Sequence, residues 1–221
     1  KIERKDGNNG DNSNNSNEVG KGNEGNIRIF DKCIGSYVDY RIGDRLASPI
    51  PLHGISLVNR LALYVEKYGS LKNRVIKTSC PSLKAVFSSE KTSDTPYKNI
   101  KTCCLRGLKP VLSLEWSNMP LVGHGEEKLV LAHKMYGFPF LDISGDFGVS
   151  SRDNYIIKAM DNEERRIYSL KDLVFLRYFL STKFALFIYS TTAYRMKYLE
   201  KYAFEFIPDL CHIPFWREKI D

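Results

Sequence analysis

Residues 128–157 constrain the fold more than any other part of the chain. They begin with residues 129–132 (LVLA), an uninterrupted apolar run of strand length, which predicts a strand at the centre of a sheet. Residues 138–143 and 149–157 also have strand character, and residues 144–148 (SGDFG) lie between them. Because a Gly-rich turn between two such stretches is typical of a β-hairpin, we expect them to pair with each other.

A helical layer is predicted after this segment. Ser169 and Asp172 have the spacing of a capping box, which predicts a helix over residues 170–180. Further helical pieces are expected near residues 183–190 and 193–204, and Pro208 would end the last. The predicted fold class is therefore α+β, with a mixed sheet, a β-hairpin and a C-terminal helical layer.

The N-terminal half is less regular. Residues 1–26 are rich in Asn, Gly, Ser and charge, and too little of them is apolar to offset the entropy of ordering, so a disordered tail or linker is expected. Ser56 can cap a helix that runs to Tyr68 and stops at Gly69. One face of that helix would carry Leu57, Leu61, Tyr64 and Val65. We expect residues 27–110 and 111–221 to pack into one continuous body.

The net charge of +7 is unevenly distributed. Residues 27–110 hold fifteen Lys and Arg against six Asp and Glu, whereas residues 111–221 hold fourteen against fifteen. A basic field of this kind attracts a polyanion such as a phosphate backbone, although a mildly basic surface without a ligand is the simpler alternative. The cations proposed for a phosphate track are Lys72, Arg74, Lys77, Lys84, Lys98 and Lys101.

The five cysteines argue against a secreted disulfide framework. Their number is odd and they form no C-x-x-C pair, so we expect a reduced, intracellular protein in the cytoplasm or nucleus. The longest apolar run, residues 184–189, is too short to cross a bilayer, and no membrane partner is expected. Because the chain begins with Lys, it is expected to be part of a longer sequence.

Residues 110–213 resemble the C-terminal specificity part of N6-adenine DNA methyltransferases from type II restriction-modification systems. The resemblance rests on the order of strand, aromatic and Gly-rich turn, polar return strand and helices. It includes Leu180-Ser-Thr-Lys183 and Ile207-Pro-Asp209, which are similar to short motifs of that family. It covers about half of the chain. The sequence is also loosely similar to chains of large DNA viruses.

This resemblance implies recognition of double-stranded DNA without catalysis in this chain. Adenine methyltransferases hold the flipped base with an Asn/Asp-Pro-Pro-aromatic motif and bind S-adenosylmethionine with a Gly-rich loop. The sequence contains no Pro-Pro pair, and no cofactor loop is recognisable. We therefore expect no cofactor, no catalytic residue and no metal ligand. A methyltransferase catalytic domain or subunit is the expected partner.

The polar cluster at residues 150–154 is the candidate for reading bases. Arg can bond a guanine edge and Asn an adenine edge, so Arg152 and Asn154 would read bases, although Arg152 and Asp153 could instead form a local ion pair. Residues 194–202 interleave tyrosines with cations, which suits phosphate contacts or a packed aromatic stripe. The remaining nucleic-acid-binding candidates are Lys134, Ser150, Ser151, Arg195, Lys197 and Lys201.

Two other functions remain open from the sequence. Glu126 and Lys128 form a Glu-x-Lys at the start of a strand, which could place a carboxylate on Mg²⁺ beside a water-activating Lys, with Asp94 or Glu115 as the second acid. Such a site would make the protein a metal-dependent nuclease. Alternatively, the aromatic surface could bind protein, as in an interaction scaffold. A zinc site is not expected, because the His and Cys residues lack ligand spacing.

Overall fold

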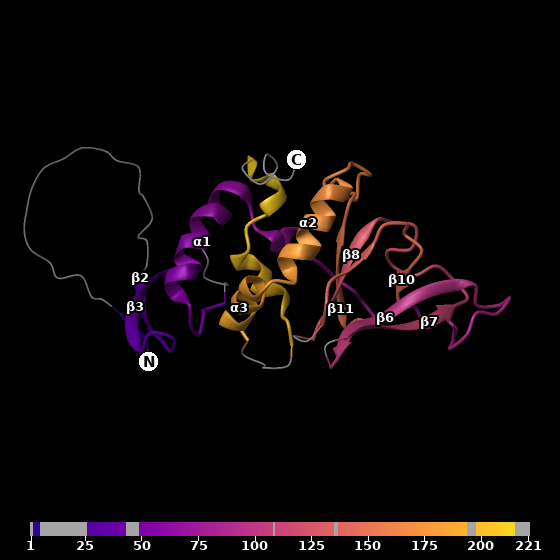
Figure 1. Ribbon diagram of the computed structural model, residues 1–221, viewed down its shortest axis with the longest axis horizontal. Helices are drawn as coiled ribbons and strands as arrows, with labels where there is room; N and C mark the ends of the chain where they lie inside the picture. The colour runs from indigo at the N-terminus through magenta and orange to yellow at the C-terminus, as the bar shows by residue number, and fades with distance from the viewer. Residues whose placement is uncertain are drawn as a thin grey trace, which may run out of the picture.

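The computed structural model of the protein describes residues 2–4, 26–42, 49–107, 109–134, 137–193 and 198–214. Figure 1 shows a small sheet at one end, helices in the middle and a long hairpin at the other end. The α+β class predicted from the sequence is confirmed. In the described part of the chain, no single helix is long and apolar enough to cross a membrane. Helices α2 (Leu170–Leu180) and α3 (Lys183–Thr191) reach that length and apolar character only together, across a bend of 68°.

The first sheet and the first helix form one end of the molecule. Strands β1 (Ile2–Arg4), β2 (Asn26–Asp31) and β3 (Ser36–Arg41) form an antiparallel sheet in that order. Because β1 pairs with β2, residues 2–4 of the expected disordered tail are a strand, and residues 5–25 lie outside the described residues. The carboxylate of Asp31 accepts the N–H of Ile55 at 2.9 Å and so joins this sheet to the following helix.

Helix α1 (Ile55–Tyr68) starts one residue before the predicted cap. Gly54, with a positive φ of 67°, precedes it in place of Ser56, and a Cβ at Gly54 would lie 2.8 Å from the Phe187 ring. The buried side chains are Ile55 and Val58, and Tyr64 is exposed, so the predicted apolar face is only partly right. Gly69 ends the helix as expected.

Two further sheets share strands from both halves of the chain. One has the order β10 (Gly148–Val149), β6 (Tyr97–Arg106), β7 (Lys109–Ser117) and β5 (Phe87–Ser88), and it is mixed because β10 pairs with β6 in parallel. The other has the order β4 (Ile76–Lys77), β11 (Asn154–Lys158), β8 (Lys128–Ala132) and β9 (Phe140–Asp142). The β6–β7 hairpin crosses residue 110, where the sequence placed a boundary between two halves.

Strand β8 is the central strand that its sequence predicts. Leu129 and Leu131 belong to the main core with the helices, whereas Val130 and Ala132 pack on the other face against Ile100 and Cys103 of β6. Every residue of β8 is buried. The apolar residue at each position from Leu129 to Ala132 is therefore explained by layers on both faces of the sheet.

The predicted hairpin of residues 138–143 and 149–157 is wrong. Strands β9 and β11 both pair with β8, on its two opposite edges, and do not pair with each other. The intervening residues form a turn around Asp142, whose carboxylate accepts the N–H groups of Gly145 at 3.0 Å and Phe147 at 3.1 Å. This carboxylate directs the chain away from β9, so β10 reaches β6 instead.

The helical layer covers the main core. Helix α2 (Leu170–Leu180) has the predicted capping box of Ser169 and Asp172, and α3 (Lys183–Thr191) follows it. The helix predicted over residues 193–204 is wrong: residues 194–197 lie outside the described residues, and a 3₁₀-helix, η2 (Lys201–Phe206), follows. Two further 3₁₀-helices are η1 (Leu71–Asn73) and η3 (Leu210–His212).

Candidate nucleic-acid interface

The loop of residues 150–153 joins β10 to β11 and is held from two sides. On one side, Ser150 donates its N–H to Ile100 O at 3.1 Å. On the other, the Thr78 hydroxyl donates to Ser151 O at 2.6 Å and to Asn154 O at 2.8 Å. The loop therefore projects from a junction between two sheets, where its conformation is fixed by hydrogen bonds to β6 and to the residue after β4.

Two of the predicted base-reading residues are interior. Asn154 is 0% exposed, and its amide donates to Lys101 O at 3.0 Å and to Ser151 O at 3.3 Å. Ser150 is 7% exposed, and its hydroxyl faces Ile100 O at 3.4 Å. Both side chains hold the loop against β6, so neither can reach a nucleic acid in this conformation.

Arg152 is exposed in this loop, and the hydrogen bonds above bring other cations beside it. Lys77 lies directly opposite Tyr155 at the start of β11, and Lys101 is the residue whose carbonyl Asn154 binds. The backbone N–H of His133 donates to Asp153 O at 2.8 Å, which brings the adjacent Lys134 to the same loop. We call this set the loop site: Lys77, Lys101, Lys134, Ser151 and Arg152.

Acidic groups reduce the positive charge of the loop site. Glu115 Oε2 lies 3.2 Å from Lys101 Nζ, and the side chain of Asp153 is 52% exposed within the loop. His133 lies between two carboxylates, 4.0 Å from Asp153 Oδ1 and 3.6 Å from Glu200 Oε2, and its ring stacks on Tyr198. The four cations of the loop site thus stand against three carboxylates, of which only Asp153 is more than half exposed, so the site keeps a small net positive charge.

The remaining candidates do not form one continuous track with the loop site. Lys72 Nζ lies 2.6 Å from Glu205 Oε2 and Arg74 Nε lies 3.3 Å from Asp209 Oδ2, so both cations tie η1 to the C-terminal segment. Lys201, partly buried, begins η2. Arg195 and Lys197 lie outside the described residues.

Lys98 belongs to a different cluster, on the opposite face of the β6–β7 hairpin from Lys101. It is paired with Trp116, whereas Lys101 reaches Glu115, the next residue along β7. Lys98 Nζ lies 5.8 Å from the Trp116 ring centroid and 4.9 Å from that of Phe147, and Lys91 Nζ lies 5.6 Å from Trp116. Sequence reasoning missed this cation–π cluster, because Lys91 and Trp116 are far apart in the chain.

The geometry of Glu126 and Lys128 does not support the nuclease alternative. The Lys128 side chain is 0% exposed, and its Nζ lies 2.5 Å from Asp142 Oδ2. Burial lowers the pKa of Lys128, and the Asp142 carboxylate opposes that shift. Glu126 Oε1 pairs with Lys158 at 2.8 Å. Lys128 is therefore a structural cation with no open side on which to activate water.

Metal-ligand side chains are not grouped in the parts that the structure describes. No cluster of three or more His, Cys, Asp or Glu side chains able to hold a metal ion occurs among those residues.

A comparison with protein-family models gives no match, and comparisons with curated proteins and with solved structures give no significant match.

The cysteines are expected to differ widely in reactivity. Burial raises the pKa of Cys103 to about 12, and its thiol faces Val130 O, whereas Cys33 and Cys80 are exposed. Because the thiolate is the reactive form, iodoacetamide at pH 8 should alkylate Cys33 and Cys80 and leave Cys103 unmodified until the protein is denatured. Peptide mass mapping measures this. Rapid alkylation of native Cys103 would show that the packing of β6 on β8 is wrong.

Proposed function

We propose that the protein binds double-stranded DNA through the loop site. The observation that carries this proposal is that hydrogen bonds from two sheets fix the loop of exposed Arg152 beside Lys77, Lys101 and Lys134. A loop whose backbone is already ordered loses little entropy when its side chains bind a ligand. Cations on such a surface can hold phosphates, while the Arg guanidinium can also bond a base edge.

The proposed biological setting is recognition of a DNA target beside an adenine methyltransferase. This part of the proposal is supported only by the resemblance of residues 110–213 to specificity domains of that class. Under this proposal the chain acts inside the cell, supplies recognition and leaves methyl transfer to a separate catalytic domain or subunit. Neither of the two interior residues, Ser150 and Asn154, contributes to DNA contact.

A selection from random duplexes tests whether the loop reads bases. The wild type should enrich a preferred sequence, and Arg152→Ala should relax the preference at one base pair and cost about 1 to 3 kcal/mol of binding on that site. Lys91→Ala is the matched control, because Lys91 is an exposed cation beside Trp116, away from the loop site. This control should keep the wild-type preference.

Two outcomes would count against the proposal. If the wild type enriches no sequence, base reading from this loop is excluded. If Arg152→Ala and Lys91→Ala select the same sequence as the wild type, then Arg152 is an ordinary solvated residue, and any DNA binding must use another surface.

A further inference from the structure

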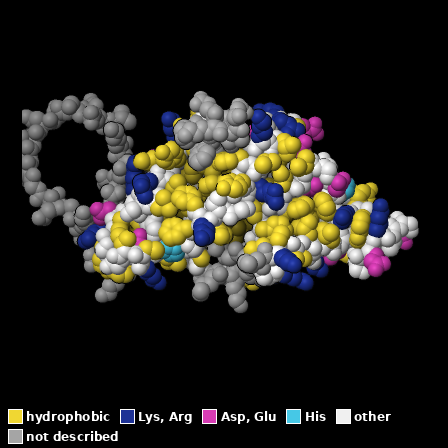
Figure 2. Space-filling model, viewed as in Figure 1, with side chains coloured by type: hydrophobic (Ala, Val, Ile, Leu, Met, Phe, Trp, Pro, Cys, Tyr) yellow, Lys and Arg dark blue, Asp and Glu magenta, His cyan; other side chains and the backbone are white. Residues whose placement is uncertain are grey.

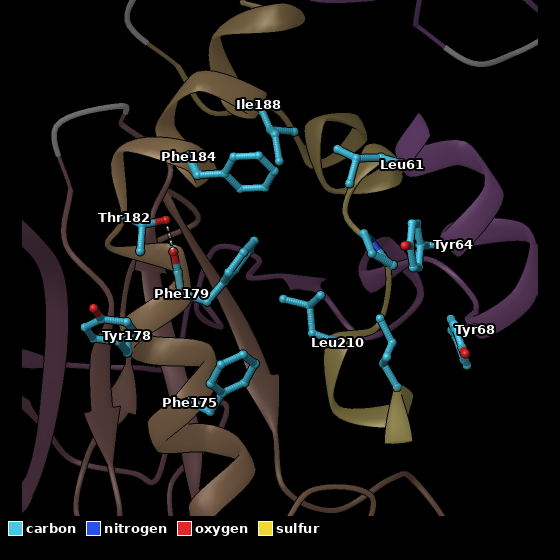
Figure 3. A pocket seen from close by; sticks show the side chains of 12 residues that line it. Leu61, Tyr64, Tyr68, Phe175, Tyr178, Phe179, Thr182, Phe184, Ile188 and Leu210 are labelled. Atoms are coloured by element: carbon cyan, nitrogen blue, oxygen red, sulfur yellow. Dashed lines mark hydrogen bonds between the residues drawn. The ribbon is translucent and has the colours of Figure 1, made fainter. Parts of the chain in front are cut away.

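An apolar groove lies between α1 and the α2–α3 pair, apart from the loop site. Its volume is about 720 Å³. Figure 3 shows Leu61, Tyr64 and Tyr68 of α1 on one side, Phe175, Phe179 and Phe184 on the other, and Leu210 between them. Among the described lining residues, Thr182 and three tyrosines carry hydroxyl groups, and the Thr182 hydroxyl already donates to Phe179 O at 2.6 Å. The groove therefore offers apolar contact and few hydrogen bonds.

The groove opens onto an exposed apolar surface. Tyr178 is 73% exposed, Tyr64 is 51% exposed and Phe184 is 42% exposed. Figure 2 shows hydrophobic side chains gathered over the central helices on this face. Large side chains exposed together around a concave site indicate an interaction surface rather than scattered apolar residues.

The helices that line this groove are rich in cations. Helices α1, α2 and α3 carry Arg60, Lys67, Lys171, Arg177 and Lys183 against only Glu66 and Asp172. Lys67 Nζ lies 5.1 Å from the ring centroid of Tyr68, a lining residue. Asp172 is already engaged in the capping box at the start of α2. The rim therefore favours an acidic occupant.

The walls of the groove also restrict the backbone of the occupant. All of its lining residues come from helices, from the turn between α2 and α3, and from the C-terminal segment that contains η3. None of the described lining residues belongs to a strand, so an extended peptide would find no sheet edge there to pair with. An α-helix satisfies its own backbone hydrogen bonds and presents apolar side chains three and four residues apart.

We propose that this groove binds an acidic amphipathic helix of a partner protein. Aromatic or aliphatic side chains on one face of that helix enter the groove, and its Glu and Asp side chains meet Lys67 at the rim. The groove shares no residue with the loop site, so the partner helix and DNA can bind independently. The proposal does not depend on DNA binding.

A designed helical peptide is the probe. It is about four turns long, carries Leu and Phe at helical spacing on one face and Glu on the others, and is labelled with fluorescein. Anisotropy titrations with the full chain should show saturable binding of this peptide. A peptide of the same composition in scrambled order and a peptide with Lys in place of Glu should each bind at least about tenfold more weakly.

Variants locate the binding. Tyr178→Ser should weaken the peptide about tenfold, whereas Leu83→Ser, at an exposed apolar residue outside the groove, should not. Lys67→Gln should weaken it about threefold, and less so at high salt, whereas Lys84→Gln should have no effect. These four residues are all exposed, so the variants are expected to fold.

Each other result overturns the proposal. Equal binding of the acidic and basic peptides would make the groove a general apolar site, and an unchanged affinity in Tyr178→Ser would place the peptide elsewhere. Dimers in sedimentation velocity that Tyr178→Ser abolishes would make a second copy the occupant. Tighter peptide binding after Trp216→Ser would make the chain's own C-terminal end the occupant.

Discussion

Replacing Asp142 with alanine should lower the free energy of unfolding by about 3 to 5 kcal/mol. The carboxylate of Asp142 is 1% exposed and lies 2.5 Å from Nζ of Lys128, which is 0% exposed. Removing one partner leaves a buried ammonium whose remaining hydrogen bond is to Glu126 O at 3.2 Å. The substitution also leaves the N–H groups of Gly145 and Phe147 without their acceptor.

Urea denaturation followed by circular dichroism measures this change. Asp142→Asn is the matched variant, because it removes the charge but keeps one of the two acceptor oxygens, so it should cost less than Asp142→Ala. Lys128→Met combined with Asp142→Ala should recover part of the loss, since no charge is then buried alone. A loss below about 1 kcal/mol in Asp142→Ala would contradict the buried ion pair.

Replacing Asp209 with alanine should lower the free energy of unfolding by about 2 to 4 kcal/mol. Asp209 is 3% exposed and joins three parts of the chain. It accepts a hydrogen bond from the Tyr168 hydroxyl at 2.9 Å, and it lies 3.3 Å from Arg74 Nε and 3.0 Å from His212 Nδ1. Burial raises the pKa of Tyr168, so its hydroxyl stays protonated and would be left buried without a partner.

A double-mutant cycle separates the Tyr168–Asp209 hydrogen bond from the contacts of Asp209 with Arg74 and His212. Tyr168→Phe removes the hydroxyl, so the loss from Tyr168→Phe with Asp209→Ala should be smaller than the sum of the two single losses. Lys72→Ala is the control, because its ion pair with Glu205 is partly exposed and should contribute less than about 1 kcal/mol. Additive losses would show that Tyr168 and Asp209 do not interact.

Asp209 and Asp142 both lie in segments that the sequence analysis singled out, and the structure shows the physical role of each. Asp209 belongs to the Ile207-Pro-Asp209 motif of the resemblance, and in the structure it is a packing and hydrogen-bonding centre. Asp142 lies in the predicted hairpin. Its hydrogen bonds to the backbone N–H groups of Gly145 and Phe147 hold a turn after which the chain pairs with β6 and not with β9. A sequence shows a carboxylate next to a Gly-rich turn, but it does not show that a buried lysine fourteen residues earlier will bind it.

Short-range patterns predicted local structure well. The apolar run of β8 and the capping box of α2 needed only neighbouring residues for their interpretation, and both are confirmed. Strand pairing was less predictable, because β8 offers two equivalent edges and the turn chemistry decides which strand takes each. The sequence of residues 193–204 had the apolar spacing of a helix. In the structure, however, Tyr198 forms an isolated β-bridge with Lys134, and η2 begins at Lys201.

The candidate site was only partly predictable for a related reason. Residue type suggested that Asn154 reads bases, but only tertiary structure shows that Lys101 O occupies its amide. Likewise, Lys72 and Arg74 looked like phosphate ligands until Glu205 and Asp209, far along the chain, came beside them. Charge in the sequence shows where cations are numerous. It does not show which of them are already paired.

The salt dependence of duplex binding tests the central claim most directly. The wild type is compared with a variant carrying Lys77→Gln, Lys101→Gln and Arg152→Gln, and with a control carrying Lys84→Gln, Lys91→Gln and Arg106→Gln. Each lost phosphate contact reduces the log–log slope by about 0.9, so the loop-site variant should lose about 2 to 3 units of slope while the control keeps the wild-type value. Equal losses in both variants, or no wild-type binding at low salt, would contradict DNA binding by the loop site.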